Sequence, residues 1–222
     1  MPETAIDFKN RRDEMVEQQI ARRGVRDPRV LDALYAVPRE AFVPAHLAEL
    51  AYDDTPLPID EEQTISQPYV VALMAEALEL SPEDRVLEIG AGSGYAAAVL
   101  SRLAREVYAV ERHGTLAESA RARLERLGYD NIHILHGDGT LGWPGHAPYD
   151  AIVVAAGGPD VPPALLDQLS PGGRLVIPVG TDPRLQKLVR VRRGLDGADR
   201  REDLGDVRFV PLVGVQGWTE EG

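Results

Sequence analysis

The sequence predicts an α/β fold in which a helical N-terminal extension precedes a doubly wound, mainly parallel central sheet. From residue 85 onward, short apolar segments typical of strands alternate with segments of helical spacing. This order implies parallel neighbouring strands joined by right-handed crossovers, with helices on both faces of the sheet. In agreement with it, the first of these strands, residues 85–89, leads directly into a glycine-rich turn that begins a helix.

Residues 1–80 are expected to form a helical portion that packs on the main domain, residues 81–222. Charged and apolar residues alternate at near-helical spacing from 10 to 35, with a break at Gly24. The stretch from 37 to 58 is rich in proline and aromatic residues and is expected to be an irregular connection.

Two proline positions mark helix starts in this portion. Pro28 fits the first turn of a short helix that reaches about Tyr35, and Asp27 before it can cap that helix. Pro68 fits the first turn of a second helix over residues 69–78.

The main domain is expected to alternate strands and helices. The expected strands are residues 85–89, 106–111, 132–136, 149–155 and 173–179, and the expected helices are residues 95–103, 116–127 and 163–169. Two late strands are expected at residues 185–191 and 207–213, separated by a polar hairpin at 194–206.

The composition narrows the functions that the chain can have. Its 222 residues are 44% hydrophobic and 27% charged, as in ordinary globular proteins. The formal net charge of −12 makes nucleic acid an unfavourable partner, because little counterion release is gained from a phosphate backbone. No apolar stretch is long enough to span a bilayer, and the N-terminal residues lack the features of a signal peptide. We therefore expect a cytoplasmic protein that binds neither nucleic acid nor membranes. A monomer is the working expectation, although nothing in the sequence determines the oligomeric state.

The chain contains no cysteine, which excludes disulfides, thiolate metal sites and a cysteine nucleophile. Its five histidines are scattered, without the spacing of a metal site, so no metal is expected.

Residues 86–95, Val-Leu-Glu-Ile-Gly-Ala-Gly-Ser-Gly-Tyr, predict a site for a nucleotide-type cofactor. A strand, a glycine turn and a helix together present backbone N–H groups and a helix N-terminus to a ligand. The dinucleotide fingerprint G-x-G-x-x-G requires a third glycine at position 95, where this chain has Tyr95, and the lysine of a P-loop is also absent. The turn therefore favours neither NAD nor a nucleoside triphosphate.

Acidic residues stand at the carboxyl ends of three successive strands. Glu88 precedes the glycine turn, Glu111 ends the second strand, and Asp138 follows the third. A carboxylate at the second position can accept both ribose hydroxyls, and one at the third can accept from an exocyclic amine. Each acid alone could be a helix cap or a surface residue. Three at neighbouring strand ends favour a shared cofactor site.

Together these features resemble the S-adenosylmethionine (SAM)-dependent methyltransferases of the seven-stranded, Rossmann-like class. The resemblance implies that Glu111 binds the ribose and Asp138 contacts the adenine, and the cationic sulfonium of SAM would suit a position beside Glu88. The cofactor-binding residues implied in this way are Glu88, Gly90, Ala91, Gly92, Ser93, Gly94, Glu111, Arg112, Gly137, Asp138 and Gly139.

A second resemblance concerns the methyl acceptor. The stretch 55–68, Thr-Pro-Leu-Pro-Ile-Asp-Glu-Glu-Gln-Thr-Ile-Ser-Gln-Pro, closely resembles the protein-L-isoaspartate O-methyltransferases, and the likeness extends over about residues 13–218. It implies methylation of the free α-carboxylate of L-isoaspartyl residues in damaged proteins and peptides, which starts their repair through a succinimide. The acceptor-binding residues implied by the resemblance are Thr64, Ile65, Ser66, Gln67, Pro68 and Val179. This chain departs from the family at residues 60–62, Asp-Glu-Glu, where members commonly carry Gly-x-Gly.

Ser66 is the expected catalytic residue. An α-carboxylate that resembles a chain terminus has a pKa of about 3.3–3.7 and needs no general base near neutral pH. The enzyme must then mainly orient it, and a hydroxyl beside free N–H groups at the start of the helix after Pro68 could form an anion site. The other interpretation is that Ser66 only caps that helix.

Two other functions remain open on the sequence alone. One is a related methyltransferase that acts on normal aspartate in a dedicated peptide. The departure from the family pattern at residues 60–62 keeps this alternative open. The other is a SAM-binding protein without turnover. Cytosine C5 methylation is excluded because the chain has no cysteine, and amino methylation of nucleic acid is disfavoured because residues 155–160 lack the (Asp/Asn)-Pro-Pro-aromatic pattern.

Overall fold

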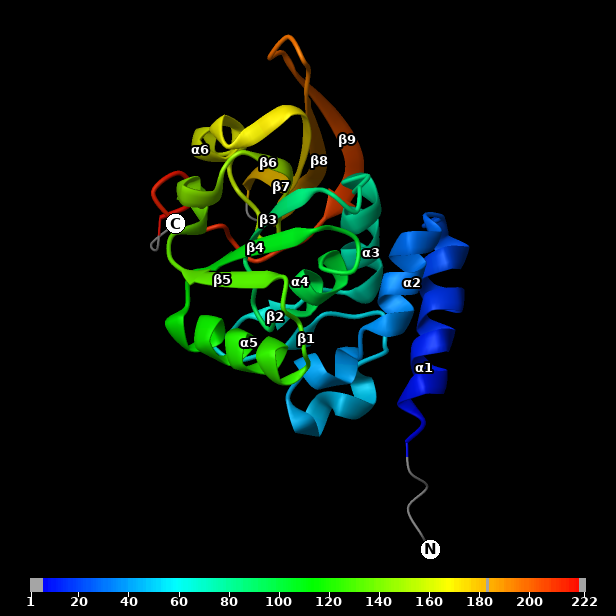
Figure 1. Cartoon of the computed structure of the whole chain (residues 1–222). Helices are drawn as coiled ribbons and strands as arrows, with labels where there is room; N and C mark the ends of the chain where they lie inside the picture. Colours follow the sequence, from blue (N-terminus) through cyan, green and yellow to red (C-terminus); the bar gives the residue numbers. More distant parts are fainter. Residues whose placement is uncertain (1–5, 183, 220–222) are drawn as a thin grey trace, which may run out of the picture.

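The computed structural model describes residues 6–182 and 184–219 and contains one seven-stranded sheet beside a small hairpin. The strand order is β5-β4-β3-β6-β7-β8-β9, and the first five strands of this order are parallel (Figure 1). The strands of the sheet are β3 (Arg85–Ile89), β4 (Glu106–Glu111), β5 (Ile132–His136), β6 (Tyr149–Val154), β7 (Leu169–Asp182), β8 (Leu185–Arg193) and β9 (Asp199–Val207). The predicted mainly parallel sheet is confirmed.

Helices cover both faces of the sheet. Successive strand residues point to opposite faces, so that the apolar strands contribute to one core on each side. Val86 belongs to one apolar core and its neighbour Leu87 to the other. The first core receives α2, α3, α4 and α5, and the second receives α6. These helices are α2 (Pro28–Ala36), α3 (Pro68–Ala77), α4 (Tyr95–Leu100), α5 (Gly114–Arg126) and α6 (Pro163–Asp167).

The N-terminal portion is helical, as predicted, and contributes to the first core. Helix α1 (Phe8–Glu14) continues through a π turn and a 3-10 turn to Gly24, whose φ of +107° ends it. Helix α2 begins at Pro28, and Asp27 caps it by accepting the Arg29 N–H. Two 3-10 helices, Arg39–Phe42 and Ala45–Leu50, lie in the stretch that was expected to be irregular.

A two-stranded hairpin, β1 (Leu57–Pro58) and β2 (Thr64–Ile65), precedes α3. Its turn places Glu61 and Glu62 in the left-handed region, with φ of +57° and +56°. A turn with two such residues fits the twist of a hairpin and normally selects glycine or asparagine. Of the two family glycines at 60 and 62, this backbone gives a physical reason for the one at 62.

The last part of the sheet differs from the prediction. Residues 199–207, most of which were assigned to the polar hairpin between the two late strands, form β9 itself, and residues 207–213, the predicted second strand, are largely irregular, with single bridges at Pro211 and Val213. β9 is an edge strand without apolar alternation, and ion pairs such as Arg190–Glu202 (2.6 Å) tie it to β8.

No helix within the described residues has the length and apolar character needed to cross a membrane.

Candidate active site

The glycine turn lies between the carboxyl end of β3 and the start of α4, as the sequence predicts. Gly92 has a φ of +53°, which side chains rarely adopt. Gly94 also has a positive φ, +88°, and in addition a Cβ on it would lie 3.2 Å from Leu124 Cδ1 of α5. Gly94 thus permits close packing of the two helices.

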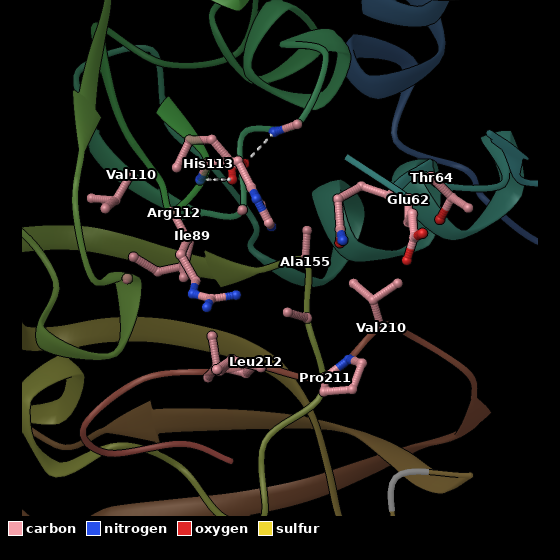
Figure 2. Close-up of a pocket in the computed structure, with 17 residues that line it drawn as sticks. Glu62, Thr64, Ile89, Val110, Arg112, His113, Ala155, Val210, Pro211 and Leu212 are labelled. Atoms are coloured by element: carbon pink, nitrogen blue, oxygen red, sulfur yellow. Dashed lines mark hydrogen bonds between the residues drawn. The ribbon is translucent and has the colours of Figure 1, made fainter. Parts of the chain in front are cut away.

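A cavity of about 260 Å³, here called the cofactor cavity, opens beside this turn (Figure 2). Figure 2 shows Val110 and Arg112 on one side, Glu62 and Thr64 on the other, and Pro211 at the lower edge. The predicted cofactor residues that line it are Gly90, Gly92, Glu111, Arg112 and Gly139.

Glu111 is held rigidly by the backbone around it. Its Oε2 accepts the Gly92 N–H at 2.8 Å, and its Oε1 accepts the His113 N–H at 2.9 Å. The carboxylate is only 5% exposed, so these bonds fix its orientation at the wall of the cavity. Each oxygen retains a further acceptor position.

Glu88 is buried without a hydrogen-bond donor in the described part of the chain. Burial, and to a smaller extent the charge of Glu111, raises its pKa well above the ordinary value. It lines a second, small cavity of about 40 Å³ together with Ser66, Ser93 and Tyr95. An unpartnered buried carboxyl group fits a ligand that brings a cation or a donor, and SAM carries both.

Asp138 is already engaged by the C-terminal segment of the chain. Its Oδ1 accepts from the N–H and hydroxyl of Thr140 at 2.8 and 2.7 Å, and its Oδ2 accepts the Val215 N–H at 2.8 Å. Burial alone would raise the pKa of Asp138, but the bonds from Val215 and Thr140 outweigh it and hold the pKa below its ordinary value. Gly214 lies so close that a Cβ on it would be 2.1 Å from Oδ1. Asp138 therefore anchors residues 214–216, a role that the sequence did not indicate.

A third cavity of about 810 Å³, here called the acceptor cavity, adjoins the cofactor cavity. The two share the wall residues Thr64, Ala155, Val210 and Pro211. Ser66 lines both the acceptor cavity and the small cavity of Glu88. It thus lies where the acceptor side meets the glycine turn.

Ser66 does not cap helix α3. The N-cap residue is Gln67, and the Ser66 hydroxyl makes no hydrogen bond within residues 6–182 and 184–219. Asp54 takes the capping role instead, because its Oδ1 accepts the Tyr69 N–H at 3.1 Å. The expectation of free N–H groups at this helix start is wrong, since Val70 and Val71 also donate, to Gln67 O. The hydroxyl alone remains available to a ligand.

The other predicted acceptor residues are not equivalent. Thr64 and Gln67 line the acceptor cavity with Ser66, whereas Ile65 and Pro68 are buried beneath it. Val179 lies in β7, paired with Lys187 across the hairpin to β8, and lines none of the three cavities described above.

Sequence reasoning missed residues 209–213 as part of the site. Val210 and Pro211 line both cavities, and Leu212 and Val213 line the cofactor cavity. The sequence shows an apolar run at these residues, but this run predicts a strand over residues 207–213 and not a wall of the site. The proline and the C-terminal anchoring at Asp138 keep this segment irregular and against the site.

The family model and the curated relatives agree on one family. The family model described as protein-L-isoaspartate(D-aspartate) O-methyltransferase (PCMT) matches residues 10–217. Protein-L-isoaspartate O-methyltransferase 1 of Geotalea uraniireducens (strain Rf4) is 66% identical over 94% of this chain and 95% of its own length. Protein-L-isoaspartate O-methyltransferase of Rhodopseudomonas palustris (strain ATCC BAA-98 / CGA009) is 61% identical over 93% of this chain and 94% of its own length.

Solved structures agree. A protein-L-isoaspartate O-methyltransferase superposes with a TM-score of 0.83 at 32% identity, over 93% of this chain and 67% of that one. A Plasmodium falciparum protein of this type, in complex with S-adenosyl-L-homocysteine, superposes with a TM-score of 0.77 at 27% identity, over 91% of this chain and 98% of that one.

Proposed function

The chain belongs to the protein-L-isoaspartate(D-aspartate) O-methyltransferase family, and from this premise we propose how its own residues perform the reaction. It is a SAM-dependent enzyme that methylates the free α-carboxylate of L-isoaspartyl residues in proteins and peptides. The amide nitrogen of the following residue then attacks the methyl ester and displaces methanol, which closes a succinimide. Water opens this ring in part to normal aspartate, so that the methylation initiates repair.

The acceptor is ionised near neutral pH, and the enzyme needs no general base to prepare it. When bound, SAM supplies an electrophilic methyl group on its sulfonium. The protein therefore contributes mainly orientation, by holding the acceptor oxygen at a near-attack distance of about 3–3.5 Å.

Ser66 is assigned the role of orienting the acceptor carboxylate. The supporting observation is its free hydroxyl at the junction of the acceptor cavity and the cavity of Glu88, with the capping role taken by Asp54. A donated hydrogen bond to one carboxylate oxygen leaves the other oxygen free to react. Thr64 and Gln67 shape the cavity around it, and the apolar residues Val210 and Pro211 limit water at the same place.

Three carboxyl groups are assigned to the cofactor. Glu111 would accept the ribose hydroxyls with the acceptor positions that its two backbone bonds leave open. Glu88 would pair with a cationic group of SAM, which would satisfy its buried oxygens. Asp138 has about one of four acceptor positions left for the adenine amine, because Thr140 and Val215 use three.

One experiment tests the acceptor. Purified enzyme is offered SAM with a radioactive methyl group and two peptides that differ only in an aspartyl or isoaspartyl linkage. Base-labile label confined to the isoaspartyl peptide is expected. Label on the normal peptide would support the alternative of a dedicated aspartate methyltransferase, and label on neither would support a SAM-binding protein without turnover. The names of the relatives favour neither alternative.

The natural substrates are proposed to be age-damaged cytoplasmic proteins, bound by a monomeric enzyme. The net charge of −12 supports the further proposal that nucleic acid is not a partner. Cell fractionation and light scattering of the purified enzyme test location and oligomeric state.

A further inference from the structure

Arginine side chains gather on the acceptor cavity, although the whole chain is strongly acidic. Arg23, Arg184 and Arg208 line it, with Asp206 as its one carboxylate among the described lining residues. The formal net charge of the chain is −12. The sign of the local charge is therefore opposite to that of the molecule.

Two of these four charges are neutralised by neighbours. Arg23 forms an ion pair with Asp54 and lies over the Tyr69 ring, 3.5 Å from its centroid. Asp206 forms an ion pair with Lys187 Nζ at 2.7 Å.

Arg184 and Arg208 keep their charge available. Both are exposed, and neither makes an ion pair or a side-chain hydrogen bond within the described part of the chain. Guanidinium groups recognise carboxylates with two parallel hydrogen bonds.

The place of these two arginines distinguishes them from Ser66. Ser66 reaches the small cavity beside the glycine turn, whereas Arg184 and Arg208 line only the acceptor cavity. They are thus suited to a part of the substrate other than the reacting carboxylate.

We propose that the enzyme prefers isoaspartyl peptides with a second carboxylate beside the isoaspartyl residue, and that Arg184 and Arg208 bind this flanking carboxylate. The proposal rests on the isoaspartyl methylation proposed above. The preference applies only to a carboxylate that reaches the two arginines in the acceptor cavity. Elsewhere the net negative charge of the chain repels an acidic peptide.

The test uses three isoaspartyl peptides that differ only at one flanking position, with Glu, Gln or Lys. The wild type is expected to show a KM about two- to fivefold lower for Glu than for Gln, and a higher KM for Lys, at unchanged kcat. Arg184→Gln and Arg208→Gln should each weaken the preference, the double variant should abolish it, and Arg208→Glu should favour the Lys peptide.

The matched control is Arg200→Gln, which removes the same charge from β9 outside the cavity and should keep the preference. Equal KM values of the wild type for all three peptides, or a preference that survives in the double variant, would overturn the proposal. If no isoaspartyl peptide is methylated, the function itself fails, and the two failures are thereby distinguished.

A second, independent observation concerns Glu61 in the turn of the β1–β2 hairpin. Its carboxylate accepts a hydrogen bond from the Thr115 hydroxyl, and its Oε2 lies 3.8 Å from His113 Nδ1. His113 is the N-cap residue of α5, where the helix dipole favours negative charge. The side chain thus joins the hairpin to the start of α5.

This contact closes one side of the cofactor cavity. Glu62 and Thr64 of the hairpin line the cavity, and Ile59 Cδ1 lies 3.4 Å from where a Cβ on Gly92 would be. We infer that Glu61 is a positioning residue that holds the hairpin over the bound cofactor and slows release of S-adenosyl-L-homocysteine.

Release of S-adenosyl-L-homocysteine is measured by stopped flow without any acceptor, so the result does not depend on methyl transfer. Glu61→Gln and Thr115→Val are each expected to raise the dissociation rate about two- to fivefold. Glu118→Gln, which removes a carboxylate from the exposed face of α5, is the control and should leave the rate unchanged. Wild-type rates in both test variants would overturn this inference, even if their melting temperatures were lower.

Discussion

Two carboxyl groups of this site, one at the end of β4 and one near the end of β3, have opposite surroundings. Glu111 accepts two backbone N–H groups, whereas no donor in the described chain reaches either oxygen of Glu88. A buried polar group without a partner costs stability, and natural proteins tolerate this mainly where function requires it. The difference points to Glu88 as the group whose partner arrives with the ligand.

Replacement of Glu88 by glutamine is expected to stabilise the free enzyme at higher pH and to weaken SAM binding. The pKa of Glu88 is raised in the folded state, so its contribution to stability is fully present below the pKa of an unfolded glutamate. That contribution is lost as the pH rises through the folded-state pKa. Above this range Glu88→Gln should be more stable by on the order of 1 kcal/mol.

Urea unfolding over a pH series, together with calorimetric titration of SAM, measures both effects. Glu118→Gln serves as the exposed control. A Glu88→Gln variant with the pH dependence of the wild type would contradict the assignment of a raised pKa.

Removal of the Ser66 hydroxyl separates orientation of the acceptor from capping. Ser66→Ala is expected to lower kcat/KM roughly tenfold to a hundredfold, the effect of a lost hydrogen bond to a charged group. SAM affinity and the free energy of unfolding should change little, because the hydroxyl makes no bond in the described chain. Kinetics, titration and urea unfolding of Ser66→Ala and of the control Ser170→Ala, at a partly buried serine of β7 outside the three cavities, provide the measurement. Normal turnover with a lower stability would show that the residue is structural.

At the scale of elements, the β1–β2 hairpin combines a strained backbone with a functional position. Glu62 has a φ of +56°, a conformation that glycine adopts without steric cost. Glu62→Gly is therefore expected to stabilise the protein by about 0.5–1 kcal/mol, after the greater freedom of glycine in the unfolded chain is subtracted. Asp60→Gly in the same turn should destabilise it, because Asp60 does not have a positive φ. Urea unfolding of both variants tests this, and equal effects would argue against strain at Glu62.

Elements with strong local signals could be predicted from the sequence, and elements fixed by distant contacts could not. The bounds of β3, β4 and β5 agree with the prediction to the residue, because each is a short strand followed by clear turn residues. The capping of α3 by Asp54 depends on a loop 15 residues away from Tyr69, and it has no sequence signature. β9 carries mostly polar residues, so it has no apolar alternation in the sequence, and only its backbone pairing and ion pairs with β8 in the structure reveal it.

At the scale of the whole molecule, the residue pattern predicts the glycine turn and the resemblance points to Ser66, but neither indicates the way in which the chain closes around them. The engagement of Asp138 by residues 214–216 depends on packing between segments more than 70 residues apart, as Val215 and Asp138 are separated by 77. The walls at Val210 and Pro211 follow from the same arrangement. Such contacts arise from tertiary structure, which local propensity does not describe.

We propose that residues 1–80 and 81–222 occupy different positions in the structure but fold and unfold together. The first core joins Leu34 of α2 with Val86 of β3 in one cluster, so loss of packing in the N-terminal portion should weaken the main domain. Leu34 is fully buried, and Leu34→Ala is expected to lower the free energy of unfolding by about 2–5 kcal/mol. The fluorescence of Trp143 and Trp218, the two tryptophans of the chain, both in the main domain, should report this shift together with circular dichroism. Leu50→Ala, at a side chain 44% exposed, should change it by less than about 0.5 kcal/mol. A tryptophan fluorescence transition that stays at the wild-type urea concentration in Leu34→Ala would show instead that the two portions unfold independently.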